Sequence, residues 1–210
     1  MRNHNKLIVV LLLISTCMLG QKKALTSSEI KALKINVENY SSKISSLESN
    51  FFQVKHMDFM EKDIKSSGKL YFKSGNVRWE YSSPYNYYMI LKNNKMHIND
   101  NGKKKEMNMS SSEMLKELSK VISGTIQGKN IFDESKFQIN YYKVLEHYQV
   151  VMVPKDKNIK KYIKQVEIGL SGNTYLVNTI KVMEPTEDYT IITFSNQKKN
   201  NTISDAKFNF

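Results

Sequence analysis

The stretch Gly68–Pro84, which reads GKLYFKSGNVRWEYSSP, decides the fold, because its side chains alternate with the period of a β-strand. Gly75 and Asn76 tolerate the positive φ of a tight reversal, and Pro84 cannot donate to a hydrogen-bond ladder. The stretch therefore predicts a β-hairpin that carries Trp79, the one tryptophan of the chain. The alternating sets are Leu70 and Phe72 before the turn and Val77, Trp79 and Tyr81 after it. Taken alone, such a hairpin is typical of the core of a β-sandwich.

This hairpin resembles the signature hairpin of the periplasmic lipoprotein carrier family, LolA, which has a glycine-led strand ending in lysine, a turn, Arg-Trp-Glu-Tyr and a proline. The resemblance is carried by Gly68, Lys73, Gly75, Arg78, Trp79, Glu80, Tyr81 and Pro84. Three other segments follow in the family's order: residues 45–53 resemble its first strand, Val153–Lys155 its mid-chain strand exit, and Ile203–Phe210 its closing strand. The resemblance thus spans essentially the whole exported chain.

Residues 1–20 have the features of a secretory signal peptide. Arg2 and Lys6 precede Leu7–Gly20, which has no charge and is shorter than the ~20 apolar residues of a membrane-spanning helix. We expect cleavage at the end of this run, and a periplasmic protein with a single domain over residues 21–210.

The segment Ile14–Cys17 is also close to a bacterial lipobox, whose cysteine is acylated after cleavage. This leaves open a second form of the protein, anchored in a membrane through Cys17. The chain has no other cysteine, so the mature domain forms no internal disulfide and no cysteine metal site.

The chain is basic, with 32 Lys and Arg against 20 Asp and Glu and a formal charge of +12. Residues 1–20 hold two of the bases and no acid, which leaves +10 on the rest. Such a charge is typical of proteins that bind nucleic acid or anionic membranes, and export excludes nucleic acid. The basic runs Lys103–Lys105, Lys155–Lys164 and Lys198–Lys199 are either solvated loops or sites of transient attraction to anionic phospholipid or an acidic partner.

Two amphipathic helices are predicted. The first spans Thr26–Ile44, where Thr26 and Glu29 form a capping box and the apolar stripe consists of Ile30, Leu33, Val37, Tyr40 and Ile44. The second spans Ser110–Ser123, begins at a serine cap and ends at Gly124. Its apolar line consists of Leu115, Leu118 and Ile122.

The remaining chain predicts short strands joined by Asn- and Gly-rich turns, and such short connections require antiparallel neighbours. The predicted strands are Phe51–Lys55, Ile64–Lys73, Val77–Tyr81, Tyr87–Leu91, Lys95–Asn99, Phe137–Tyr142, Tyr148–Val153, Val166–Leu170, Leu176–Met183, Tyr189–Asn196 and Phe208–Phe210. Lys155–Lys164 is expected to be a basic loop or a short helix. The sequence therefore predicts a β-meander interrupted by one helix.

No motif of an enzyme or of a metal site is present. The histidines of the mature chain, His56, His97 and His147, lack the spacing of metal ligands, and the sequence contains no nucleophile elbow and no phosphate loop. We therefore expect a protein without catalytic activity, metal or cofactor.

The resemblance implies a mainly β, α+β fold: an incomplete antiparallel β-barrel covered by an N-terminal helix and an inserted lid helix, with lipoprotein acyl chains held between them. Trp79 matches a cavity-lining position of the family. From alternation we expect the lipid-binding side chains to be Phe51, Leu70, Phe72, Trp79, Tyr81, Met89 and Leu91, and the lid side chains to be Leu115, Leu118 and Ile122. The sequence does not distinguish a hollow from a filled core.

Many relatives hold the lid closed with a basic residue in the hairpin turn. Here the turn is Lys73-Ser74-Gly75, which lacks the family's proline and arginine, so Lys73 or Arg78 would control the lid. Arg78 has a second potential partner in Glu80.

The resemblance implies a monomeric carrier that moves lipoproteins from the inner to the outer membrane. Its partners would be triacylated lipoproteins, an inner-membrane ABC lipoprotein-releasing complex and an outer-membrane acceptor. Two alternatives stay open: a membrane-anchored lipoprotein of the same fold that acts as acceptor or envelope-stress sensor, and an enzyme or structural envelope protein with a filled core.

Overall fold

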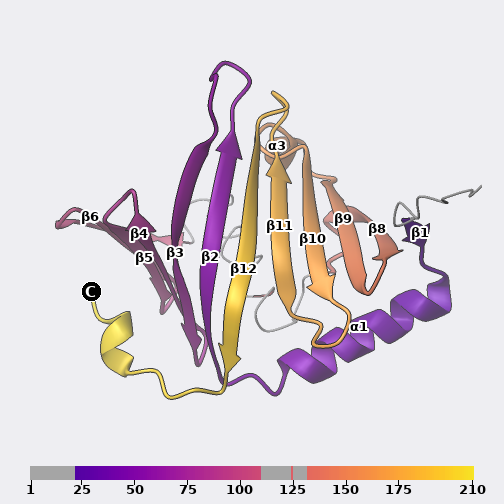
Figure 1. Cartoon of the computed structure of the whole chain (residues 1–210), viewed down its shortest axis with the longest axis horizontal. Helices are drawn as coiled ribbons and strands as arrows, with labels where there is room; N and C mark the ends of the chain where they lie inside the picture. Colours follow the sequence, from indigo (N-terminus) through magenta and orange to yellow (C-terminus); the bar gives the residue numbers. More distant parts are fainter. Residues whose placement is uncertain (1–21, 110–123, 125–131) are drawn as a thin grey trace, which may run out of the picture.

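A computed structural model describes residues 22–109, 124 and 132–210. In this part of the chain, twelve strands form one sheet in which every neighbouring pair is antiparallel (Figure 1). The strands are β1 (Lys23–Ala24), β2 (Ser46–His56), β3 (Ile64–Lys73), β4 (Asn76–Ser83), β5 (Tyr87–Lys92), β6 (Lys95–Asp100), β7 (Lys103–Asn108), β8 (Phe137–Val144), β9 (His147–Pro154), β10 (Gln165–Ser171), β11 (Val177–Met183) and β12 (Tyr189–Lys199). The helices are α1 (Ser27–Ser41), α3 (Lys157–Lys160) and the 3-10 helix η2 (Asp205–Phe208).

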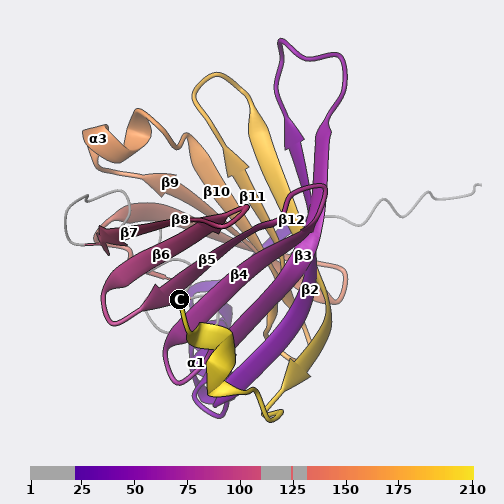
Figure 2. The ribbon, with the colours of Figure 1, turned by 90° about the vertical axis from the view of Figure 1, so that its left-hand side faces the viewer.

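The sheet consists of two meanders. Strands β2 to β7 follow one another, strands β8 to β12 do the same, and the two series meet where β12 pairs with β2. In the described residues β1 and β7 end the strand order and do not pair with each other, so the sheet is curled but not closed (Figure 2). The predicted incomplete antiparallel barrel is confirmed.

The hairpin predicted from Gly68–Pro84 is formed by β3 and β4. Leu70 lies opposite Trp79 in its register, so these two side chains share a face of the sheet. The reversal differs in detail, because Ser74 and Gly75 have the positive φ values, 49° and 84°, and Asn76 already begins β4.

Helix α1 begins as its sequence predicts. Thr26 is the N-cap, and its side chain and that of Glu29 form both hydrogen bonds of a capping box. The helix ends at Ser41 rather than Ile44. Leu33 and Val37 are its buried apolar side chains.

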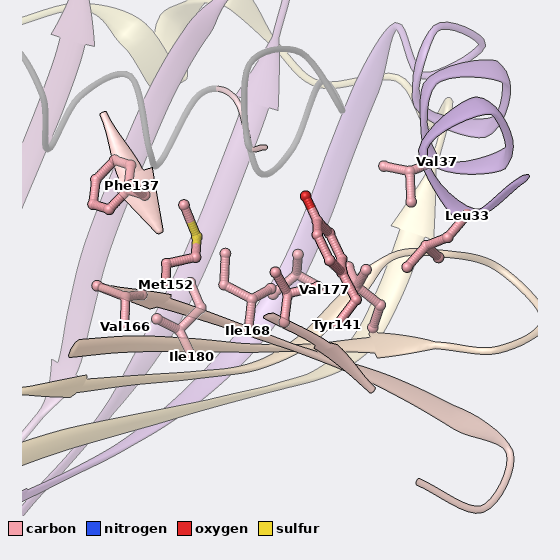
Figure 3. Packing of buried hydrophobic residues seen from close by; sticks show 11 residues of the cluster. Leu33, Val37, Phe137, Tyr141, Met152, Val166, Ile168, Val177 and Ile180 are labelled. Atoms are coloured by element: carbon pink, nitrogen blue, oxygen red, sulfur yellow. The ribbon is translucent and has the colours of Figure 1, made fainter. Parts of the chain in front are cut away.

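A buried apolar cluster joins α1 to strands β8 to β11. Figure 3 shows Leu33 and Val37 extending from α1 toward the side chains of the sheet. The other buried members are Phe137, Tyr141, Val150, Met152, Val166, Ile168, Leu170, Val177 and Ile180. We call this the α1 cluster.

A polar contact holds the same helix to β8. The carboxylate of Glu134 accepts from Lys34 of α1 at 2.5 Å and from the hydroxyl of Tyr141 at 3.1 Å. Burial raises the pKa of Tyr141, and the bond to Glu134 raises it further. The phenol therefore stays protonated and continues to donate to Glu134.

Three predictions about the elements have different outcomes. The closing strand at Phe208–Phe210 is wrong, because the chain forms η2 there, with the Ser204 side chain accepting from the Ala206 amide. The short helix expected within Lys155–Lys164 is α3. The helix predicted at 110–123 lies outside the described residues.

No helix in the described part of the chain is long and apolar enough to cross a membrane.

Candidate functional site

The seven side chains predicted to bind lipid lie together on one face of the sheet. Leu70, Trp79 and Met89 are consecutive partners across β3, β4 and β5, and alternation brings the other members to the same face. We call the group the Trp79 cluster; its buried members are Ile44, Leu47, Phe51, Leu70, Phe72, Val77, Trp79, Leu91, Met96, Met109 and Leu176, and its half-buried members include Tyr81, Met89, Ile192 and Phe194.

Aromatic rings form the centre of this cluster. The ring centroids of Phe51 and Trp79 are 4.4 Å apart, and that of Tyr81 meets Phe51 edge-on at 5.1 Å. Phe194 of β12 meets Trp79 edge-on at 5.9 Å. These are favourable distances for aromatic pairs. The rings therefore form one contiguous apolar surface across β2, β4 and β12.

The five predicted residues Phe51, Leu70, Phe72, Trp79 and Leu91 are only 2–7% exposed. Tyr81 and Met89 are half-buried. These side chains are thus packed against one another.

The polar groups in this cluster are few. The hydroxyl of Tyr81 donates to Oε1 of Gln53 at 2.9 Å. Burial raises the pKa of Tyr81, and hydrogen bonding of its oxygen to the indole of Trp79 opposes this rise. The indole Nε1 of Trp79 is itself buried.

Residues 42–210 match the outer membrane lipoprotein carrier protein LolA. The chain belongs to the LolA family. A comparison with curated proteins finds no match.

Solved structures resemble this LolA-family chain in fold. An uncharacterized conserved protein from Thermus thermophilus aligns with a TM-score of 0.53 and 6% identity over 87% of this chain and 94% of that one. A complex of MucA and MucB from Pseudomonas aeruginosa aligns with a TM-score of 0.50 and 8% identity over 87% of this chain and 61% of that one. A LolA superfamily protein from Nitrosomonas europaea aligns with a TM-score of 0.47 and 7% identity, over 86% and 97%. At these identities the likeness concerns the fold alone.

The two halves of this LolA-family sheet differ in what backs them. Helix α1 contributes Leu33 and Val37 to the α1 cluster, but only the half-buried Tyr40 to the Trp79 cluster. Phe194 packs against both clusters. Among the described residues, the Trp79 cluster is therefore built almost wholly from strands and the turns between them.

Lys73 and Arg78, the proposed lid-control residues, lie on the opposite, outer face. The ammonium group of Lys73 donates to the Ile203 carbonyl at 2.8 Å and to Asp205 at 2.7 Å. Arg78 donates to Glu80 at 2.7 Å and to the Lys207 carbonyl at 3.2 Å. Both side chains therefore fasten the C-terminal segment, which crosses the outside of β4 and β5 (Figure 2).

An apolar contact supports these polar ones. Ile203 and Phe208 are buried against Tyr71 and Ile90 of β3 and β5, which we call the outer cluster. The guanidinium of Arg78 lies 3.7 Å from the ring centroid of Tyr88 beside it. The C-terminal segment thus covers the outer face of the same strands whose inner face forms the Trp79 cluster.

Sequence reasoning missed several members of the Trp79 cluster. Leu176, Met107 and Met109 come from turns and an edge strand, and Ile192 and Phe194 come from β12. The alternation of Ile192, Thr193 and Phe194 was a usable signal for β12, whereas the turn residues follow no period. The predicted lid residues Leu115, Leu118 and Ile122 lie outside the described residues. No cluster of metal-ligating side chains occurs within the described ranges.

Proposed function

We propose that this chain binds the acyl chains of lipoproteins on the Trp79 cluster and carries them across the periplasm. Triacylated lipoproteins would be received from an inner-membrane ABC lipoprotein-releasing complex and passed to an outer-membrane acceptor. Each acyl CH2 group exposed to water costs about 0.8 kcal/mol, so such a ligand needs an apolar enclosure to leave a membrane. Membership of the LolA family supports the proposal.

One observation carries the proposal: the apolar side chains of β2 to β6 converge in one cluster on the inner face of a sheet that stays open. Helix α1 adds Leu33 and Val37 to the α1 cluster beside it, whereas among the described residues it adds only Tyr40 to the Trp79 cluster. Strand side chains can separate without breaking the backbone ladder beneath them. We therefore expect the ladder to support a face that opens when a ligand binds.

Separating the side chains of the Trp79 cluster costs free energy and so lowers the affinity for a ligand. Because these side chains are packed together in the free chain, we expect only a minor population to be competent to bind. The apparent affinity then falls in proportion to that population. We expect association to be slower than diffusion allows.

Titration of the exported protein with a fluorescent fatty acid and with isolated lipoprotein tests the proposal. Trp79→Arg places a charge in the cluster and should abolish saturable binding. Phe52→Arg is the matched control, because Phe52 alternates with Phe51 onto the outer face of β2 and is 46% exposed. Saturable binding that persists in Trp79→Arg, or its absence from the wild type, would contradict the proposal.

A separate measurement decides between a soluble carrier and an anchored relative. Intact mass of the protein recovered from the membrane and soluble fractions shows whether Cys17 is acylated. We expect the soluble form to begin after residue 20. A diacylated Cys17 would instead favour the acceptor or sensor role on the same fold.

A further inference from the structure

A basic corner lies at one end of the sheet, where β9 ends and β10 begins. It consists of residues 155–164, which include α3 and hold five lysines against one acid, Asp156. All five lysines are exposed. Figure 2 shows α3 at the periphery of the molecule, beyond the end of β9. We call this segment the α3 corner; five positive charges less one negative charge leave +4, which attracts anions.

The one acid of the α3 corner is engaged by the backbone. The carboxylate of Asp156 accepts from two amides of the first turn of α3, the nearer at 2.6 Å, and so caps the helix. Lys161 donates to the side-chain oxygen of Asn158, a neutral partner, at 3.4 Å. Among the described residues, Lys157, Lys160 and Lys161 form no ion pair with a carboxylate. No described carboxylate therefore neutralises these three charges.

The other two lysines of the α3 corner hold it to the rest of the protein. Lys155 donates to the Glu134 carbonyl at 2.6 Å, and Lys164 pairs with Glu187. The backbone amide of Lys164 also donates to the Met183 carbonyl at 2.8 Å. These contacts fix both ends of the segment, so the three lysines between them are presented on a firm support.

An exposed tyrosine lies among these lysines. Tyr162 is 59% exposed, whereas the next residue, Ile163, packs against the α1 cluster. The amides of both residues donate to the Ile159 carbonyl, at 3.0 and 2.9 Å, which closes the turn. Tyrosine is enriched at membrane–water interfaces, because its ring is apolar and its hydroxyl is polar. Lysines beside an exposed tyrosine thus match the headgroup region of an anionic bilayer, which offers phosphates next to an apolar layer.

We propose that the α3 corner docks the protein on the surface of an anionic phospholipid bilayer. Lys157, Lys160 and Lys161 lie at the phosphates, and Tyr162 lies at the level of the headgroups. The attraction of each lysine adds to the others and decays within a Debye length of ~8–10 Å, so docking is weak, reversible and sensitive to salt. This inference goes beyond the proposed function, because it uses neither the Trp79 cluster nor an acyl ligand.

Sedimentation of the exported protein with phospholipid vesicles tests the inference. One set of vesicles is phosphatidylcholine alone, and the other is equal parts of phosphatidylcholine and phosphatidylglycerol. We expect binding only to the vesicles that contain phosphatidylglycerol, and we expect added salt to reverse it. The triple variant Lys157→Gln, Lys160→Gln and Lys161→Gln should bind about 100-fold more weakly, as the loss of three lysines near the membrane allows.

A matched control removes the same charge from another part of the surface. It replaces Lys103, Lys104 and Lys105 of the edge strand β7 by glutamine, and should lose little affinity for the vesicles. All the substituted lysines are exposed, so both triple variants should keep the melting temperature of the wild type. Equal losses of vesicle binding in the two variants would show that net charge alone attracts the membrane, and would overturn the inference.

A second variant separates a bilayer from an acidic protein partner. Tyr162→Ser keeps every lysine but removes the ring, and should weaken binding to the vesicles that contain phosphatidylglycerol. Soluble polyglutamate is the probe for a purely acidic surface. If the wild type binds polyglutamate as tightly as these vesicles, and Tyr162→Ser changes neither affinity, an acidic partner explains the α3 corner and the inference is overturned.

A measurement on the wild type locates the contact without any variant. A nickel-chelating lipid in the vesicles that contain phosphatidylglycerol broadens the amide NMR signals of the residues nearest to the bilayer. The strongest broadening should fall within residues 157–163. Strongest broadening at the exposed Leu145, in the turn at the opposite end of β9, overturns the inference, as does an absence of binding to these vesicles. Vesicle binding as expected, together with no saturable acyl binding, would contradict the proposed function alone.

Discussion

The ring of Phe51 lies directly over Gly68 of the neighbouring strand. A Cβ added to Gly68 would come within 2.7 Å of the Phe51 ring and would also meet the carbonyl oxygen of Glu80. The two residues are cross-strand partners in the register of β2 and β3. A glycine in a strand interior often marks a close approach of this kind. The glycine that leads the signature hairpin thus makes room for the ring that packs on Trp79.

Gly68→Ala should therefore destabilise the fold and disturb the Trp79 cluster together. Forcing one extra carbon against the Glu80 carbonyl and the Phe51 ring costs about 1–3 kcal/mol, as overpacking of a core does. Urea unfolding measures the loss, and Ser67→Ala, at the preceding residue of β3, is the control. A Gly68→Ala protein as stable as the control would show that both the ring and the β4 backbone move aside freely.

Substitutions in the α1 cluster and in the Trp79 cluster should both lower stability, but only those in the Trp79 cluster should weaken lipid binding. Leu33→Ala in the α1 cluster and Leu70→Ala in the Trp79 cluster each remove a side chain that is at most 3% exposed, so each should cost about 2–5 kcal/mol. Only Leu70→Ala should also weaken lipid binding. Denaturant unfolding and lipid titration of the two variants check this, and equal effects of both on binding would contradict the separation.

Lys73 should act on the C-terminal segment rather than on the inner face. Lys73→Met removes the donor to the Ile203 carbonyl and to Asp205. We expect faster amide hydrogen exchange in residues 203–208 and unchanged lipid affinity. Lys69→Met is the matched control, because Lys69 lies on β3 like Lys73 but pairs with Glu48 of β2 instead of the C-terminal segment. A large change in lipid affinity with Lys73→Met would restore Lys73 to lid control.

The contact between Lys73 and Asp205 predicts that docking of the C-terminal segment weakens at acid pH. The hydrogen bond from Lys73 holds the pKa of Asp205 below its ordinary value of 3.8. The bond therefore stabilises the docked segment above that value and loses this effect as the pH falls through the lowered pKa. The protection factors of residues 203–208, which are exchange rates corrected for the intrinsic pH dependence of each amide, should fall in this acid range in the wild type. In Asp205→Asn the protection factors should be low throughout, and an identical pH profile of protection in both proteins would contradict the assignment.

His56 predicts a second pH dependence of stability, of opposite sign, in the loop between β2 and β3. Its Nδ1 lies 2.8 Å from Asp63 and its Nε2 lies 3.4 Å from Asp58. The hydrogen bond that the protonated ring donates to Asp63 raises the pKa of His56 above its ordinary value of 6.5, although desolvation opposes this. The protonated form thus stabilises the loop below pH 6.5, and this effect is lost as the pH rises through the raised pKa.

An NMR titration of the His56 ring measures that pKa. Asp63→Asn should lower the pKa of His56 toward 6.5, because the carboxylate that accepts from the protonated ring is lost. Glu61→Gln removes a carboxylate from the same loop and should leave it nearly unchanged. A pKa of His56 that does not respond to Asp63→Asn would show that the carboxylate is not its partner in solution.

Local periodicity predicted the parts of the fold that local sequence determines. The alternation through Gly68–Pro84 gave the hairpin and the shared face of Leu70 and Trp79, and the Thr26 and Glu29 capping box gave the start of α1. Strand β7 was missed because its sequence, KKKEMN, has no apolar alternation, as befits an exposed edge strand.

Long-range contacts account for what the sequence did not reveal. The pairing of β12 with β2 joins segments far apart in the chain, and no local pattern specifies it. The end of the chain alternates like a strand at Phe208–Phe210, yet Ile203 and Phe208 pack on Tyr71 and Ile90, and η2 forms instead. Packing on a distant surface overrode local propensity there.

Quenching of Trp79 fluorescence by a lipid with brominated acyl chains tests the central claim most directly. Bromine quenches only at near contact, and the chain has a single tryptophan, so the signal reports on this cluster alone. We predict saturable quenching that an unbrominated lipid reverses by competition. A brominated lipid that binds the protein without quenching Trp79 would show that acyl chains are held elsewhere, and would contradict the account.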